Sequence, residues 1–276
     1  MRIDSHNHFW KYDPARHGWI DDSMRAIRRD FLPEDFDYVL KNNHMEGTIA
    51  VQADQTEEET SFLLGLADQY DFIKGVVGWV DLRSEKVADR LRYFSQFDKL
   101  VGFRHIVQAE LDPSFMLRED FQRGLSALGE FDFTYDILVY PHQLEAALKT
   151  IELHPHQKFV IDHIAKPEIA TGIITEWSGR ISQIADFSNV MCKLSGLITE
   201  ADWQEWRLSQ FTPYLDEVME SFGIDRVMFG SDWPVCLLAG SYNEVRDLME
   251  MYFDSYSIED KKKIFGLNAM NFYGVK

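Results

Sequence analysis

The stretch Ile3–His8, with the sequence IDSHNH, has the pattern of a short strand that carries two histidines separated by one residue. Successive side chains of an extended strand point to opposite faces, so Asp4, His6 and His8 share one face. Two imidazoles on one face can hold a divalent cation or donate hydrogen bonds to a developing oxyanion. A histidine pair alone is a weak signal, so its meaning depends on the partners that the rest of the chain supplies.

Beyond this stretch, apolar β-rich runs alternate with helical patterns. The expected strands are short and mostly apolar throughout, as in a parallel sheet buried on both faces, and cover 3–8, 47–52, 75–80, 100–107, 132–140, 158–163, 189–194 and 226–230. Helices are expected from Pro33, over 57–70, 86–97, 121–128, 143–153, 175–186 and 202–222, and from Ser257 to Tyr273. Eight strands close a barrel, so we expect a (β/α)8 TIM-type barrel, with a doubly wound open sheet as the second choice.

The composition is that of a globular chain with a sizeable core. Hydrophobic residues make up 45% of the 276 positions, and barrels of this type run to about 250 residues as one domain, so we expect one domain over 1–276. No apolar run of about 18 residues and no signal-peptide pattern is present, which favours a cytoplasmic protein. Cys192 and Cys236, the only cysteines, lie far apart, which argues against a disulfide framework and a zinc ribbon.

The charge restricts the class of partner. A formal net charge of −18 repels nucleic-acid phosphates and anionic membrane surfaces, so we expect neither nucleic acid nor membrane as a partner. A neutral small molecule is favoured over a strongly anionic one. The sequence is compatible with a homo-oligomer and does not fix the number of subunits.

Polar residues gather at the expected C-terminal ends of the strands, where barrel enzymes place their chemistry. These residues are His6 and His8, Gln52, Arg104 and His105, Asp136 and Tyr140, His163, Lys193 and Asp232. Each has an ordinary structural explanation alone, but together they indicate a polar site. The long aromatic segment 9–31 after the first strand is also expected to serve this site and to influence substrate choice.

Six short motifs follow one another at these strand ends and in the last helix. They are IDSHNHFW (3–10), GFRH (102–105), DHIAKP (162–167), CKLSGL (192–197), GSDWP (230–234) and FGLNA (265–269). This ordered set resembles the amidohydrolase superfamily. Within the superfamily it is most similar to the amidohydrolase-2 group and its sugar-lactonase branch, of the L-fuconolactonase and L-rhamnono-lactonase type. The resemblance covers essentially the whole chain and implies the barrel fold.

The resemblance also implies a site for at most one divalent metal ion, such as zinc. Its ligands would be His6, His8 and Asp232, with His163 nearby. Binuclear members bridge two ions with a carboxylated lysine on the fourth strand, where this chain has Arg104 and His105. Metal is not always required in the lactonase branch, so a metal-independent site in which the histidines only form hydrogen bonds stays open.

The implied activity is hydrolysis of a sugar (aldono) lactone to the aldonic acid in carbohydrate catabolism. Asp232 would act as general base on a water molecule with help from His163, while His6 and His8, or a metal ion that they hold, would stabilise the oxyanion. The residues expected to bind the substrate are Arg104 and His105 at the carbonyl or ring oxygen, Gln52, Asp136 and Lys193 at the hydroxyls, and Trp10 or Trp233 at an aromatic face.

Two other functions stay open. One is a mononuclear zinc amidohydrolase or an aromatic-acid decarboxylase of the same superfamily. The other lies outside enzymes and is a sugar-binding protein on a barrel that has lost its activity.

Overall fold

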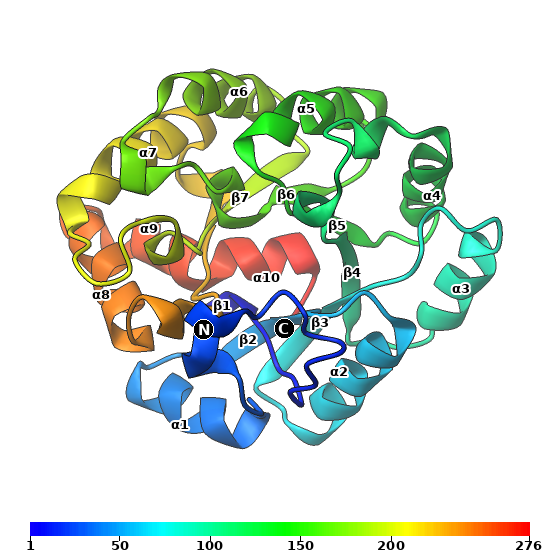
Figure 1. Cartoon of the computed structure of the whole chain (residues 1–276), viewed down its shortest axis with the longest axis horizontal. Helices are drawn as coiled ribbons and strands as arrows, with labels where there is room; N and C mark the ends of the chain where they lie inside the picture. The colour runs from blue at the N-terminus through cyan, green and yellow to red at the C-terminus, as the bar shows by residue number, and fades with distance from the viewer.

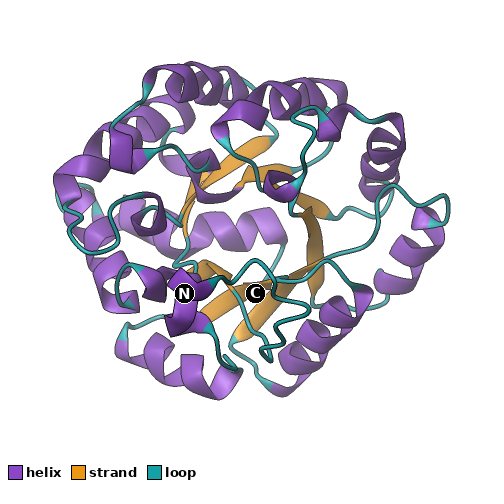
Figure 2. Ribbon diagram, viewed as in Figure 1, coloured by secondary structure: helices purple, strands orange, loops and turns teal.

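The computed structural model describes residues 1–276 and contains one eight-stranded parallel sheet whose strands follow one another in sequence order. The strands are β1 (Ile3–Asn7), β2 (Gly47–Val51), β3 (Ile73–Gly78), β4 (Leu100–His105), β5 (Thr134–Ile137), β6 (Phe159–Ile161), β7 (Val190–Leu194) and β8 (Val227–Phe229). In Figure 1 the strands form a ring at the centre of the molecule, and Figure 2 shows the helices arranged around it. The predicted (β/α)8 barrel is therefore confirmed.

The helices lie between successive strands and after the last one. They are α1 (Pro33–Asn42), α2 (Glu57–Gln69), α3 (Val87–Phe94), α4 (Glu119–Gly129), α5 (Leu144–Leu153), α6 (Thr175–Ala185), α7 (Leu208–Phe222), α8 (Tyr242–Tyr252), α9 (Ile258–Lys262) and α10 (Asn268–Tyr273). Their apolar faces cover the outside of the sheet, as where Phe94 of α3 contacts Phe103 of β4. None of the helices combines the length and apolar character needed to cross a lipid bilayer.

The barrel closes between its first strand and the segment that follows its last. The His8 amide donates to the Trp233 carbonyl at 2.7 Å, and the Asp232 amide donates to the His6 carbonyl at 2.8 Å. These two hydrogen bonds place His6 of β1 and His8, which directly follows the strand, beside a carboxylate more than two hundred residues later in the chain. The contact that closes the barrel therefore also assembles the polar site at its C-terminal mouth.

A small apolar cluster seals the opposite end of the barrel. Ile3, Val77 and Met228 from inside the sheet pack against Phe272 and Tyr273 of the C-terminal helix. In Figure 1 this helix, α10, crosses the centre of the ring. The barrel is thus a filled core at one end and a polar pocket at the other, which is the usual division in this fold.

Two predicted helices are shorter than their sequence patterns suggest. The helix predicted over 202–222 begins at Leu208, because the Asp202 carboxylate accepts from the Gln204 and Glu205 amides and holds a turn there instead. The last predicted helix is interrupted by a π turn, Lys263–Leu267. A Cβ on Gly266 would lie 2.1 Å from the Met1 carbonyl oxygen. Glycine therefore permits a close approach of the two chain ends that helical periodicity does not reveal.

Candidate active site

Three potential metal ligands meet at the point of barrel closure. Nε2 of His6 lies 3.2 Å from Nε2 of His8, and Oδ1 of Asp232 lies 3.3 Å from His8 Nε2 and 3.9 Å from His6 Nε2. All three side chains are almost fully buried. Ligands about 2.0–2.1 Å from a tetrahedral zinc ion lie about 3.3 Å from one another. The three atoms therefore fit one face of a zinc coordination shell.

The hydrogen bonding of His8 supports this fit. Its Nδ1 lies 2.8 Å from the Val51 carbonyl oxygen, which only accepts, so Nδ1 carries the proton. In neutral His8 the lone pair of Nε2 then faces Nε2 of His6 and the carboxylate of Asp232. Three electron-rich atoms that converge in a buried site need a shared proton or cation. The chemistry of this donor set suits a divalent metal ion.

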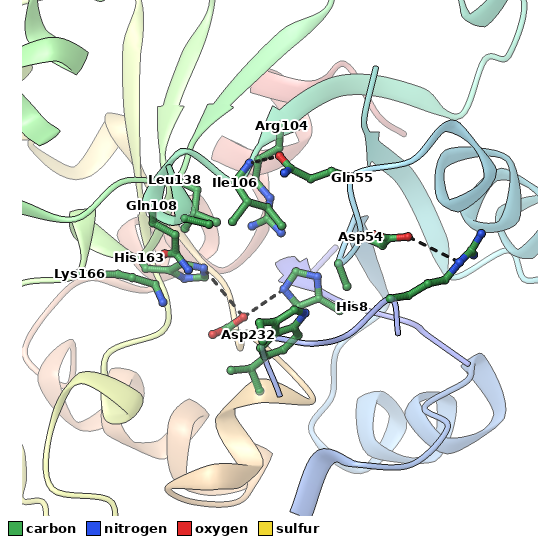
Figure 3. A pocket seen from close by; sticks show the side chains of 15 residues that line it. His8, Asp54, Gln55, Arg104, Ile106, Gln108, Leu138, His163, Lys166 and Asp232 are labelled. Atoms are coloured by element: carbon green, nitrogen blue, oxygen red, sulfur yellow. Dashed lines mark hydrogen bonds and ion pairs between the residues drawn. The ribbon is translucent and has the colours of Figure 1, made fainter. Parts of the chain in front are cut away.

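His163 occupies the side of Asp232 opposite His8, as Figure 3 shows, with its Nε2 at 3.9 Å from Oδ1. It lies in a tight turn after β6 in which residues 163–166 all have positive φ angles. Ser195 Oγ lies 2.8 Å from its Nδ1, and a Cβ on Gly196 would lie 2.6 Å from that atom. An unusual backbone and a glycine thus fix the ring against the carboxylate, at a strain that is common at functional sites.

A cavity of about 310 Å³ opens above these groups. The residues that line it are His8, Arg16, Trp19, Ala53, Asp54, Gln55, Arg104, Ile106, Gln108, Ala109, Leu138, His163, Lys166, Asp232 and Val235. Figure 3 shows the labelled members of this set around the hollow. Its wall combines apolar side chains with several hydrogen-bonding groups, as expected for a small polar molecule with a carbon skeleton.

The environment sets the charge of the central groups. Burial alone would raise the pKa of Asp232, but the facing imidazoles of His163, His8 and His6 hold it well below its ordinary value. Burial lowers the pKa of His163 to about 4. At neutral pH the site therefore presents an ionised carboxylate beside a neutral imidazole, and both groups can accept a hydrogen bond from a water molecule.

A buried ionic network lies beneath His6. The Lys193 ammonium donates to Asp136 at 2.5 Å and lies 3.0 Å from Asp162, which also pairs with Arg104 at 3.0 Å. Tyr273 of α10 donates to the same Asp136 oxygen at 2.8 Å. Two cations therefore balance two carboxylates, which is the condition for charges to persist in a dry interior.

The structure divides the predicted site residues into three groups. His8, Arg104, His163 and Asp232 line the cavity. His6, Gln52, Asp136 and Lys193 are fully buried and do not line it. We predicted substrate contacts for Gln52, Asp136 and Lys193, but their side chains are engaged in protein contacts instead. Gln52 bonds to Arg104 at 3.0 Å, and the other two form the network beneath His6.

Three further predicted contacts face away from the cavity. Trp10 is fully buried and donates to the Arg29 carbonyl, while Trp233 stacks on Phe36 with ring centroids 4.4 Å apart. His105 stacks on Phe115 and lies 2.7 Å from the carboxylate of Glu110. These rings therefore shape the walls from behind, whereas the indole on the cavity surface belongs to Trp19, which is 40% exposed.

Several lining residues have no counterpart among the predicted contacts, namely Arg16, Trp19, Asp54, Gln55, Gln108 and Lys166. Three of them had an available signal, since Lys166 belongs to the DHIAKP motif, and Arg16 and Trp19 belong to the aromatic segment expected to serve the site. The buried Asp162 precedes His163 in that motif and was also not predicted as a site residue. The remaining residues lie just after strand ends, in loops without a distinctive pattern.

Comparisons with known proteins show what the chain is similar to. The family model described as Amidohydrolase (Amidohydro_2) matches residues 3–275. L-fucono-1,5-lactonase of Burkholderia multivorans is 39% identical, with 100% of this chain and 96% of the relative covered. L-fucono-1,5-lactonase of Burkholderia ambifaria is 35% identical at the same coverage.

A solved structure shows the likeness in three dimensions. An amidohydrolase from Burkholderia multivorans, crystallised with bound zinc, superposes with a TM-score of 0.97 over 100% of both chains at 39% identity. The match of the family model over nearly the whole sequence, together with these relatives, shows that the chain belongs to the amidohydrolase family.

Proposed function

We propose that this protein hydrolyses a sugar lactone, with Asp232 activating the attacking water. The observation that carries the proposal is the position of the ionised Asp232 carboxylate between His8 and His163 at the base of a cavity of about 310 Å³. The names of the relatives, L-fucono-1,5-lactonases at 35% and 39% identity, support a sugar lactone as the substrate class. Opening such a lactone belongs to carbohydrate breakdown.

In the proposed reaction a water molecule beside Asp232 attacks the lactone carbonyl carbon. As the new C–O bond forms, Asp232 accepts a proton from the water. The neutral imidazole of His163 has its Nε2 3.9 Å from Oδ1 of Asp232 and stabilises the Asp232 side chain after it has accepted the proton. A positioned general base of this kind accelerates a reaction by about 10²- to 10⁴-fold.

The charge that develops on the carbonyl oxygen needs a cationic partner. The Arg104 guanidinium lies in the cavity wall, with Nη1 3.2 Å from His6 Nε2, and so lies beside the cluster of His6, His8 and Asp232. A zinc ion bound by His6, His8 and Asp232 would act as a Lewis acid on the carbonyl oxygen and lower the pKa of the attacking water. Fixed positive groups in a buried site stabilise an oxyanion strongly, because they need no reorganisation.

Collapse of the tetrahedral intermediate breaks the bond between the carbonyl carbon and the ring oxygen. The proton held by Asp232 then passes to the departing alkoxide, which becomes the free hydroxyl group of the aldonic acid. Water adds across one C–O bond, and Asp232 returns to its starting ionised state. The new carboxylic acid keeps the other proton of the water and releases it to the solvent, and the cavity cations Arg16, Arg104 and Lys166 can then attract the product carboxylate.

The reaction class is tested by following proton release with a pH indicator across fucono-, rhamnono-, arabinono- and xylono-lactones. We expect turnover of at least one lactone above its spontaneous hydrolysis, slowed by a chelator and restored by zinc. An N-acyl amino acid and a dihydroxybenzoate serve as comparison substrates for the amidase and decarboxylase alternatives. Turnover of either of these without turnover of any lactone would contradict the proposal.

A further inference from the structure

Gln55 lies on the cavity wall, in the short segment between β2 and α2. Its Oε1 accepts from the backbone amide of Ile106 at 2.8 Å, which is the one hydrogen bond that its side chain makes. A backbone N–H can only donate, so the oxygen of the side-chain amide is the atom that faces Ile106. The orientation of the Gln55 amide is therefore fixed, and its nitrogen Nε2 is the polar atom that it offers to the cavity as a donor.

The backbone at both ends of this hydrogen bond is held in place. Thr56 caps α2, and its Oγ1 accepts from the Glu59 amide and donates to the Asp54 carboxylate, both at 3.2 Å. Ile106 directly follows β4, so the side chain of Gln55 joins the loop after β2 to the loop after β4. A donor anchored in this way has the rigidity needed to orient a ligand.

The surroundings of Gln55 make its donor selective. Two apolar residues of the same loops, Ala53 and Ile106, line the cavity with it. A polar group set in a partly apolar wall fixes the orientation of a ligand, because few other hydrogen bonds compete with it. The other amide that lines the cavity, that of Gln108, lacks such an anchor, since its Oε1 has no hydrogen-bond partner.

The position of Gln55 indicates which part of a lactone it meets. Figure 3 shows its side chain reaching along the wall to Ile106, on the opposite side of the hollow from Asp232. A lactone whose carbonyl carbon lies beside Asp232 turns the far side of its ring toward Gln55. On a sugar lactone that side carries hydroxyl groups, whose oxygen atoms can accept a hydrogen bond.

We propose that Gln55 is a specificity-determining residue whose Nε2 donates to a hydroxyl oxygen of the substrate. It thereby selects polyhydroxylated lactones against analogues that lack this one hydroxyl group. The selection arises because an analogue without the hydroxyl leaves the anchored donor unpaired in the complex. The inference rests on the proposed function, since the attack at Asp232 decides which side of the lactone faces Gln55.

The test combines a change in the protein with a change in the substrate. Gln55→Met keeps a side chain of similar length and removes the Nε2 donor. The substrates are the lactone that the wild type opens fastest and its monodeoxy analogues, each without one hydroxyl group. We expect the wild type to open one analogue with a kcat/KM about tenfold below that of the parent lactone. In Gln55→Met this difference should shrink to about twofold or less, because the parent lactone has lost the same hydrogen bond.

This design separates substrate recognition from a structural role. Gln55→Met also leaves the Ile106 amide without its partner, and a loosened loop would lower kcat/KM for every substrate by the same factor. The matched control is Gln69→Met, the same change at the exposed end of α2, which should keep the wild-type preference. An equal loss for the parent and all analogues in Gln55→Met would overturn the inference. So would a wild type that opens all the analogues as efficiently as the parent, and this arm needs no variant to fold.

A binding measurement distinguishes this inference from the proposed reaction. Calorimetry compares the parent lactone and its analogues on Asp232→Asn, with and without Gln55→Met. A preference for one hydroxyl group that Gln55→Met removes would support the inference even if the wild type turned over no lactone, and only the proposed reaction would then fail. Turnover whose selectivity does not depend on Gln55 would leave the reaction standing and overturn the inference. Neither turnover nor binding of any lactone would overturn both.

Discussion

Glu59, at the first turn of α2, is a buried carboxyl group outside the catalytic cluster. Its side chain is 5% exposed and accepts from the Ala53 amide at 3.2 Å. Burial raises its pKa from 4.5 to about 7. Because the folded state holds the proton to a higher pH than the unfolded chain, stability is lost as the pH rises from about 4.5 to about 7.

Glu59→Gln keeps the hydrogen bond acceptor and removes the ionisation. The wild type loses stability over this range and the variant does not. The unfolding free energy of the variant minus that of the wild type should therefore increase by about 2 kcal/mol from pH 5 to pH 8. Urea denaturation at the two pH values measures the change. Glu58→Gln, an exposed change on the same helical turn, is the control. An equal difference between Glu59→Gln and wild type at both pH values would show that the buried carboxyl is not the cause.

For individual residues, the sequence predicted the location of a side chain correctly where that location follows from the residue's place at the end of a strand. His8, Arg104, His163 and Asp232 were predicted at strand ends, and all four line the cavity. Strand position could not show that Asp136 and Lys193 satisfy each other inside the barrel. That pairing depends on how adjacent strands are staggered across the closed sheet, which only the three-dimensional register determines.

For the segment between β1 and α1, the sequence predicted that the segment contributes to the site but not which of its side chains do so. Its length and aromatic content predicted a part in the site, and Arg16 and Trp19 do line the cavity. The sequence pattern did not indicate which tryptophan faces the cavity. Trp10 is held inward by backbone hydrogen bonds with Phe31 at 2.9 Å, so the exposed indole is that of Trp19.

We expect Trp19 to contribute an apolar face to the bound lactone. Trp19→Ala should raise KM about fivefold with a smaller effect on kcat, because aromatic contacts of this kind contribute about 1 kcal/mol and lie away from the reacting carbonyl. Steady-state kinetics on the preferred lactone measure both constants. Trp19→Phe, which keeps an aromatic ring, should restore most of the loss. Unaltered kinetics in Trp19→Ala would exclude this contact.

For the whole molecule, the fold was predictable because eight apolar runs separated by helical patterns leave few arrangements. Element ends were less predictable, since the Asp202 turn and the approach of Gly266 to Met1 are tertiary effects. Closure of the ring is the event with the largest consequence for function. It sets the first strand against the loop after the last, and so turns two distant motifs into one site.

The central claim is that this assembled site hydrolyses a lactone with Asp232 as the base. The most direct test compares kcat of the wild type, Asp232→Asn and the wall variant Asp54→Asn on the lactone that the wild type opens fastest. We predict that Asp232→Asn lowers kcat by about 10²-fold or more. The folded Asp54→Asn variant should keep kcat within about tenfold, because the Asp54 carboxylate belongs to the cavity wall and faces Arg16, 3.9 Å away. Full activity in Asp232→Asn would contradict the claim.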